Sequence, residues 1–316
     1  MISLSLALGA GVGLTALQNH RRQSRAQQSH PPEGQFLQVA GRRIHAVEMG
    51  QPAGSAPDVV LIHGSNGSTR DMSFRLAPAL ADRYRVLMLD RPGLGYSDPI
   101  AKTPASLRNQ ASYLCTAAQM IGVERPIVLG QSYGGGVALA WALQHPDSLS
   151  ALVSVSGVSH PWDGSLDLFY RLTASWPGQY LLVPMITAFV PDQTIRRSLV
   201  DVFAPQPVPE GYVDHLGIGL TLRSGSLRAN ARQLAQLFED IKRQSQHYGR
   251  ITAPAELIHG AADTTVGLKI HAEKLAADLP NANLTVLPGV GHMPHHVATD
   301  EVVGAVDRAA IRAGLM

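Results

Sequence analysis

The chain has few of the residues that build disulfides, thiolate metal sites and nucleic-acid surfaces. Among its 316 residues there is one cysteine, Cys115, which excludes an intrachain disulfide and a cysteine-based metal site. Only 16% of the residues are charged, and the formal net charge is +2. The sequence has no stretch in which basic residues alternate with aromatic ones. The composition therefore argues against nucleic-acid binding and is compatible with one large α/β unit.

Long apolar runs are also scarce, and the clearest one stands at the N-terminus. Residues 1–17 carry no charge, and Arg21, Arg22 and Arg25 follow. A helix of about 17 residues rises about 25 Å, slightly less than a hydrocarbon core of about 30 Å. Arginines after the run place that side in the cytoplasm. We expect residues 1–30 to form an uncleaved membrane anchor and basic linker with a cytoplasmic catalytic domain. The alternative is a cleaved signal of a secreted or periplasmic protein.

The most informative motif is Gly130-Gln131-Ser132-Tyr133-Gly134, a G-x-S-x-G pentapeptide. It stands between a strand-like run, residues 126–129, and a helix-like run, residues 135–143. A serine on such a sharp turn presents its Oγ clear of its neighbours, and the flanking glycines let strand and helix approach closely. The N–H of Tyr133 then points to where an oxyanion would form. The motif predicts Ser132 as a nucleophile.

A serine nucleophile needs a base and an acid that orients the base. Asp263 follows the strand-like run 255–259, and His292 follows the run 284–287. The chain order Ser132, Asp263, His292 is the α/β-hydrolase order, with each residue just past a predicted strand. Asp163, near the start of a long insertion, is the runner-up for the acid.

Two further histidines, His295 and His296, lie close to His292. A metal site would need more ligands, and no carboxylate or cysteine stands at ligand spacing in the same segment. We therefore expect no metal and no cofactor.

Two more motifs extend the pattern: Val59-Val60-Leu61-Ile62-His63-Gly64-Ser65 and Asp90-Arg91-Pro92-Gly93-Leu94-Gly95-Tyr96-Ser97. With them, the sequence resembles the α/β-hydrolase fold family from about residue 36 to the C-terminus. The resemblance implies an oxyanion hole formed by the N–H groups of Ser65, with Asn66 as second choice, and of Tyr133. The resemblance also implies that the motif at residues 90–97 has an architectural role.

The order of strands and helices indicates an α/β fold with a mostly parallel sheet covered on both faces. We expect an edge hairpin at residues 36–48 and strands at residues 59–62, 85–89, 127–129, 151–155, 255–259 and 284–287. The pattern breaks in a helical, aromatic-rich insertion where the family carries a cap. The expected divisions are residues 1–30 for the anchor, 31–160 and 251–316 for the hydrolase core, and 161–250 for the cap.

These features predict a serine hydrolase that cleaves carboxylic esters with apolar acyl groups, with a small-molecule ester as partner. The cap aromatics are expected to enclose Ser132. One alternative is a C–C bond hydrolase of diketone or dienol substrates that uses the same triad. It would need cationic groups for its substrate, and the cap offers Arg171, Arg196, Arg223 and Arg228. Another alternative is a membrane-tethered binding protein without catalysis.

Overall fold

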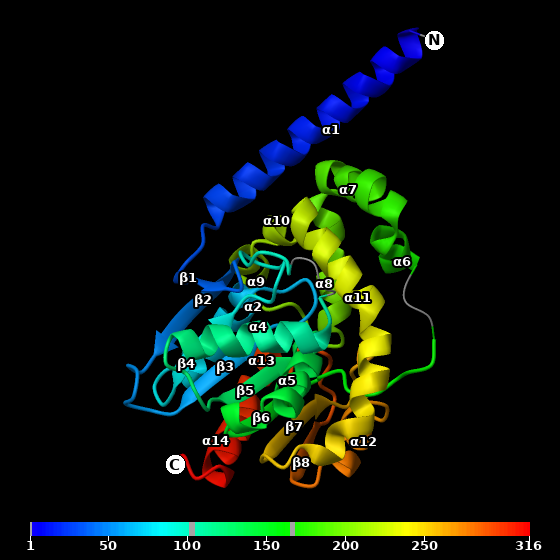
Figure 1. Cartoon of the computed structure of the whole chain (residues 1–316). Helices are drawn as coiled ribbons and strands as arrows, with labels where there is room; N and C mark the ends of the chain where they lie inside the picture. The colour runs from blue at the N-terminus through cyan, green and yellow to red at the C-terminus, as the bar shows by residue number, and fades with distance from the viewer. Residues whose placement is uncertain (1, 101–104, 165–167) are drawn as a thin grey trace.

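The computed structural model describes residues 2–100, 105–164 and 168–316, with side chains from residue 11 onward. An eight-stranded sheet in the order β1-β2-β4-β3-β5-β6-β7-β8 forms its centre (Figure 1). The strands are β1 (Gln35–Val39), β2 (Arg42–Gly50), β3 (Asp58–Ile62), β4 (Arg85–Leu89), β5 (Ile127–Gln131), β6 (Ala151–Val155), β7 (Ala255–Gly260) and β8 (Ala282–Leu287). Every strand expected from the sequence is present, which confirms the predicted α/β fold.

The sheet is parallel except at one edge. β1 pairs antiparallel with β2 and β2 pairs antiparallel with β4, while the neighbours from β4 to β8 run parallel. The predicted hairpin therefore forms this edge. Its two-residue turn, Ala40-Gly41, has positive φ angles of 48° and 74°, as the right-handed twist of the two strands favours.

Helices cover both faces of the sheet. One face packs against α4 (Leu107–Met120), α5 (Tyr133–Gln144) and α12 (Ala272–Asp278). The other packs against α3 (Leu76–Leu80) and α14 (Thr299–Arg312). Because both faces are covered, β4, β5 and β6 are buried at every residue, as their mostly apolar sequences predict.

A helical insertion, which we call the cap, separates β6 from β7 (Figure 1). It contains α6 (Leu168–Ala174), η2 (Gly178–Leu182), α7 (Val183–Phe189), α8 (Asp192–Phe203), α9 (Tyr212–Leu216), α10 (Ile218–Thr221), α11 (Ser224–Gln244) and η3 (Ser245–Arg250). Residues 165–167, which the sequence assigned to the cap, lie outside the described residues.

The N-terminal segment forms one helix, α1 (Ile2–Ser29), which packs against α7 and α10 and projects beyond the cap (Figure 1). Arg22 ties it to the cap, because its Nη1 donates to the Val190 carbonyl oxygen at 2.7 Å. Across the residues that the structure describes, no helix combines the length and the apolar character needed to cross a membrane. Met1 lies outside the described residues.

Candidate active site

Ser132 stands at the turn between β5 and α5 with φ 53° and ψ −120°, a backbone conformation that L residues rarely adopt. Its N–H donates to the Val155 carbonyl oxygen at 3.0 Å. Gly134 lets α5 approach β3, since a Cβ at this position would lie 2.2 Å from the Ile62 carbonyl oxygen. The hydrogen bond to Val155 and the close packing of α5 on β3 therefore stabilise the strained turn.

The structure brings Ser132, Asp263 and His292 together from the ends of three strands. The Ser132 Oγ lies 2.9 Å from His292 Nε2, and His292 Nδ1 lies 2.8 Å from Asp263 Oδ2. All three residues are almost enclosed, with Ser132 still 9% exposed. A hydroxyl, an imidazole and a carboxylate in this order can activate the hydroxyl as a nucleophile.

The Asp263 carboxylate is held by several donors. Its Oδ1 accepts hydrogen bonds from the backbone N–H groups of Thr265 and Val266, both at 2.9 Å. Burial alone would raise the pKa of Asp263, but His259, His292 and the Val266 N–H together lower that pKa well below its usual range. Asp263 therefore stays ionised beside His292.

The runner-up acid occupies a different environment. Asp163 is exposed, in the segment that follows β6. The carboxylate that contacts His292 comes from the loop after β7.

The loop after β3 carries the expected oxyanion donor Ser65, which is half-buried. The next N–H, that of Asn66, already donates to Asn230 Oδ1 of α11 at 3.0 Å. Buried Arg91 fixes the start of this loop, because its guanidinium donates to the carbonyl oxygens of His63 and Gly64 at 3.0 and 2.9 Å. The motif that contains Arg91 therefore supports the loop.

Sequence reasoning missed Gln131, the variable residue directly before Ser132. Gln131 is buried and donates from Nε2 to the His292 carbonyl oxygen at 3.2 Å. Its place inside the G-x-S-x-G motif was a usable signal, since the residue before the nucleophile lies at the end of the same buried strand.

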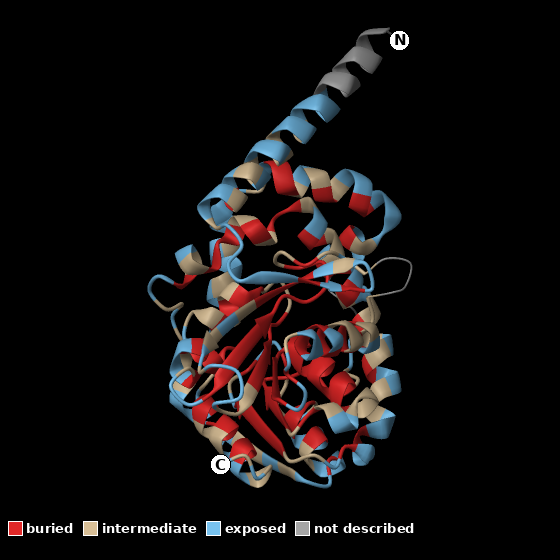
Figure 2. Cartoon of the chain, turned by 60° about the vertical axis from the view of Figure 1, so that its left-hand side comes forward, coloured by how far each residue is buried: buried red, intermediate tan, exposed pale blue. Residues whose placement is uncertain are grey.

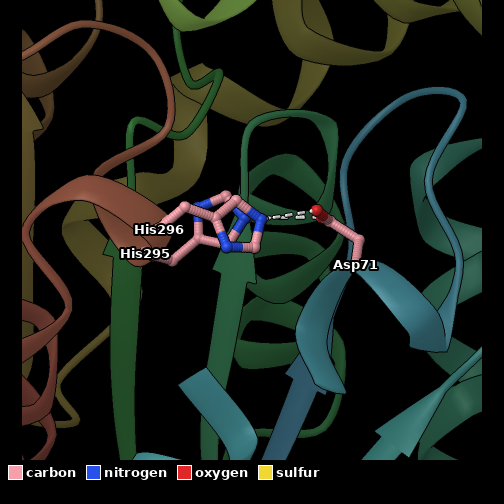
Figure 3. Close-up of side chains that lie close together, drawn as sticks. All are labelled: Asp71, His295 and His296. Carbon is pink, nitrogen blue, oxygen red and sulfur yellow. Dashed lines mark hydrogen bonds and ion pairs between the residues drawn. The ribbon is translucent and has the colours of Figure 1, made fainter. Parts of the chain in front are cut away.

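A second buried cluster joins Asp71 of α2 (Thr69–Ser73) to His295 and His296 of α13 (Pro294–Val297) (Figure 3). The sequence around His295 and His296 offers no carboxylate at ligand spacing, but in the structure Asp71 reaches both histidines from a distant segment. These three residues could hold a metal ion, because their candidate ligand atoms lie within 4.8 Å of one another. Protein groups also satisfy the carboxylate, since Asp71 Oδ1 accepts hydrogen bonds from Tyr212 at 2.7 Å and His296 at 2.8 Å.

The cap aromatics do not all enclose Ser132. Trp176, Tyr180 and Phe189 are 76%, 58% and 52% exposed, which corrects the expectation that they line a pocket over the nucleophile. Phe203 and Tyr212 are buried against His296 instead. The cap helices turn some of their aromatic side chains outward, which the sequence pattern alone did not reveal.

A cavity of about 300 Å³ lies between α1 and the cap. Its lining includes Arg22 and Ala26 of α1, and Thr187 and Leu222 of the cap. Ser132, Asp263 and His292 do not line this cavity, so we do not assign the substrate to it.

The geometry agrees with a comparison of the whole chain with protein families. A family model described as alpha/beta hydrolase fold matches residues 57–299, most of the chain. The chain belongs to the α/β-hydrolase fold family. This α/β-hydrolase has relatives with different named activities, so the family does not fix its substrate.

Two relatives illustrate the range. A 2-hydroxy-6-oxononadienedioate/2-hydroxy-6-oxononatrienedioate hydrolase of Cupriavidus pinatubonensis is 30% identical, over 79% of this chain and 84% of that protein. A pimeloyl-[acyl-carrier protein] methyl ester esterase of Chromobacterium violaceum is 27% identical, over 76% of this chain and 89% of that protein.

Solved structures share the fold at lower identity. A membrane phospholipase A superposes with a TM-score of 0.66 at 21% identity, covering 98% of this chain and 97% of that chain. A thermophilic esterase from Thermogutta terrifontis gives 0.70 at 18% identity, covering 89% and 99%.

Proposed function

We propose that this α/β-hydrolase is a serine hydrolase that cleaves carboxylic esters with apolar acyl groups through an acyl-enzyme. The observation that carries the proposal is the unbroken hydrogen-bonded series from Ser132 through His292 to Asp263, at 2.9 and 2.8 Å. Each group has the chemistry that its place in the series requires: nucleophile, base and ionised acid.

The proposed reaction uses each group in turn. Ser132 Oγ attacks the ester carbonyl carbon while His292 Nε2 accepts its proton, and Asp263 stabilises the imidazolium that results. The N–H groups of Ser65 and Tyr133 are the proposed oxyanion donors, and loss of one such donor typically costs about 10²–10³ in rate. His292 then protonates the departing alcohol, and water repeats the sequence to release the acid.

The preference for apolar acyl groups is supported by the surroundings of the catalytic loop. Met293, directly after His292, packs in one apolar cluster with Phe203, Leu216 and Ile218 of the cap. A methylene buried in such surroundings contributes about 0.8 kcal/mol, roughly a fourfold gain in rate constant per carbon.

The dienedioate hydrolase among the relatives favours a second candidate, hydrolysis of a C–C bond in a diketone or dienol substrate. Such a substrate would carry a carboxylate, which needs an available cation. Arg196 pairs with Asp214 at 3.2 Å, and Arg223 donates to the Leu220 carbonyl oxygen at 3.0 Å. Arg228 likewise donates to the Gln179 carbonyl oxygen, and Arg171 lies exposed on the cap, so the ester reaction remains the primary proposal.

A direct test combines labelling with a substrate series. A fluorophosphonate should label the protein but not Ser132→Ala, whose circular dichroism should be unchanged. With activated esters, kcat/KM should rise about fourfold per methylene from acetyl to about butyl or hexyl. Full labelling of Ser132→Ala would place the nucleophile elsewhere. Faster turnover of a dienol diketone than of every ester would support the C–C reaction, and inertness to all of them would support a binding protein.

We also propose that the N-terminal segment anchors the protein to a membrane with the catalytic domain in the cytoplasm. The support is the uncharged run of residues 1–17 followed by Arg21, Arg22 and Arg25. The full-length protein should stay with membranes through an alkaline carbonate wash, whereas a chain lacking residues 1–30 should be released by that wash. Recovery of a shortened mature chain outside the cytoplasm would instead support a secreted or periplasmic protein.

A further inference from the structure

The outer side of the cap carries an unusual row of large apolar side chains. They come from α6, η2 and α7 and the residues between them: Leu168, Leu172, Trp176, Tyr180, Leu181, Met185 and Phe189, which we call the cap stripe. Each member is between 48% and 76% exposed. Within the groups 168–180 and 181–189, successive members are four residues apart, the spacing that puts helical side chains on one side.

The inner side of the same helices buries two small apolar residues, Val183 and Ala188, and is otherwise glycine or polar. Thr173, Gln179 and Thr187 are buried to 0%, 5% and 2% exposure. Their polar groups form hydrogen bonds within the segment or with α11. From α11, the Arg228 Nε donates to the Gln179 carbonyl oxygen at 2.9 Å, and Ser224 donates to Thr187 at 3.2 Å. A water-exposed helix normally buries its apolar side and exposes its polar side. In this segment the large apolar side chains are the exposed ones, so its outer environment should be apolar.

Elsewhere on the described surface, large exposed apolar side chains are scattered. Outside α1 and the cap they are Phe36, Met120, Val286, Ile311 and Met316, each on its own element or terminus. Single exposed apolar residues are ordinary, whereas a continuous apolar patch marks an interaction surface.

The helix α1 extends the cap stripe. It packs along α7, and both views show it projecting past the cap, whose outer surface is largely exposed (Figures 1 and 2). Val12, Leu14 and Leu17 are 67%, 60% and 46% exposed. Leu17 precedes Arg22, the residue tied to the cap, by about 7 Å of helix. The apolar part of α1 and the cap stripe therefore lie at the same end of the molecule.

The composition around the stripe fits a lipid surface. Trp176 and Tyr180 pair at a ring-centroid distance of 5.2 Å, and such amphipathic rings favour the level of lipid headgroups. From residue 168 to residue 191 the only charged residue is basic, Arg171, and exposed Arg21 and Arg25 stand on α1. Basic groups beside an apolar patch attract anionic headgroups.

We propose that the cap stripe docks on the surface of a lipid bilayer, with its side chains entering the boundary between headgroups and acyl chains. The stripe would hold the cap, and the hydrolase core beneath it, against the membrane. This inference depends on neither the reaction at Ser132 nor the orientation of α1 in a membrane.

Trp176 provides a built-in reporter, because Trp141 is fully buried and Trp162 is half-buried. The full-length protein would be reconstituted with vesicles of phosphatidylcholine and phosphatidylglycerol, with and without brominated acyl chains. Tryptophan emission should shift to the blue on addition of vesicles and should be quenched by the brominated lipid. Both changes should disappear in Trp176→Phe.

Paired variants separate the stripe from general hydrophobicity. Leu181→Ser and Met185→Ser should each shift the docking equilibrium of the cap about tenfold toward the undocked state, measured as a loss of Trp176 quenching by brominated lipid. The matched variants Met120→Ser and Ile311→Ser remove exposed apolar side chains far from the cap and should bind as the parent does. All four should keep the circular dichroism spectrum and the thermal unfolding midpoint of the parent.

Two results would overturn the proposal. One is a folded parent protein on vesicles whose Trp176 emission is neither shifted nor quenched by brominated lipid. The other is a dimer in sedimentation that Leu181→Ser and Met185→Ser convert to monomer, which would assign the stripe to a second copy of this chain.

Discussion

Gln131 Nε2 donates a hydrogen bond to the main-chain carbonyl oxygen of His292, at a nitrogen-to-oxygen distance of 3.2 Å. Gln131 is 2% exposed and directly precedes Ser132 in the chain. The end of β5 therefore presents the nucleophile Ser132 and also binds the loop that carries the base, His292. Such a bond fixes the position of His292 without contacting the substrate, so Gln131 is a positioning residue.

Gln131→Leu should lower kcat about fivefold with little change in KM. Leucine is of similar size but cannot donate, and the hydrogen bond is worth about 1 kcal/mol, which corresponds to about a factor of five in rate. Steady-state kinetics on an activated ester would measure both constants. Gln246→Leu, on the exposed surface of η3, is the control. An unchanged kcat in Gln131→Leu would show that His292 keeps its position without this bond.

Asp263→Asn should reduce kcat by about 10⁴, because an amide cannot stabilise the imidazolium and favours the wrong tautomer of His292. Asp163→Asn makes the same chemical change at an exposed aspartate and should leave kcat within about twofold, as surface substitutions usually do. If Asp163→Asn gave the larger loss, the acid would belong to the segment after β6.

The loop that carries Ser65 and Asn66 offers a third prediction. Asn230 of α11 accepts the Asn66 N–H at 3.0 Å, and Asn66 has a positive φ of 56°. Asn230→Ala should loosen the loop and lower kcat about tenfold, since the half-buried N–H of Asn66 loses its partner. Asn283→Ala, on the remote strand β8, removes an amide that donates to Glu256 and serves as control. Equal kcat values for the two variants would contradict the prediction.

The sequence was sufficient for the sheet and for the candidate nucleophile, base and acid. Buried parallel strands appear as short apolar runs, and Ser132, Asp263 and His292 each follow one of them. Because the carboxyl ends of parallel strands meet at one edge, local patterns were enough to bring these residues together in space.

Contacts without a local pattern could not be predicted. Asp71 and His296 are 225 positions apart, and no periodicity links them. The cap presented a different difficulty: its apolar residues recur at helical spacing whether they face the core or the outside. It is tertiary packing, by α1 against α7 and by α11 against Gln179 and Thr187, that leaves Trp176 and Phe189 exposed.

The last prediction concerns acid stability and buried His63. The imidazole Nδ1–H donates to the Gly64 carbonyl oxygen at 2.9 Å, and Nε2 accepts the Arg91 N–H at 3.0 Å. This arrangement requires a neutral ring. Burial, and then the charge of Arg91, lower the pKa of His63 to about 4. In the unfolded chain the pKa of a histidine is about 6.5.

Between these two pKa values the unfolded state binds a proton that the folded state does not, so stability is present above pH 6.5 and decreases toward pH 4. The difference corresponds to at most about 3 kcal/mol from His63. Denaturant unfolding at pH 7 and pH 4.5 should show a smaller loss of unfolding free energy in His63→Gln than in the parent. Buried His271 and His296, whose pKa values are also lowered to about 4, contribute to both proteins alike. His247→Gln, at an exposed histidine, should lose as much as the parent. An equal loss in His63→Gln and the parent would show that His63 is not part of the acid sensitivity.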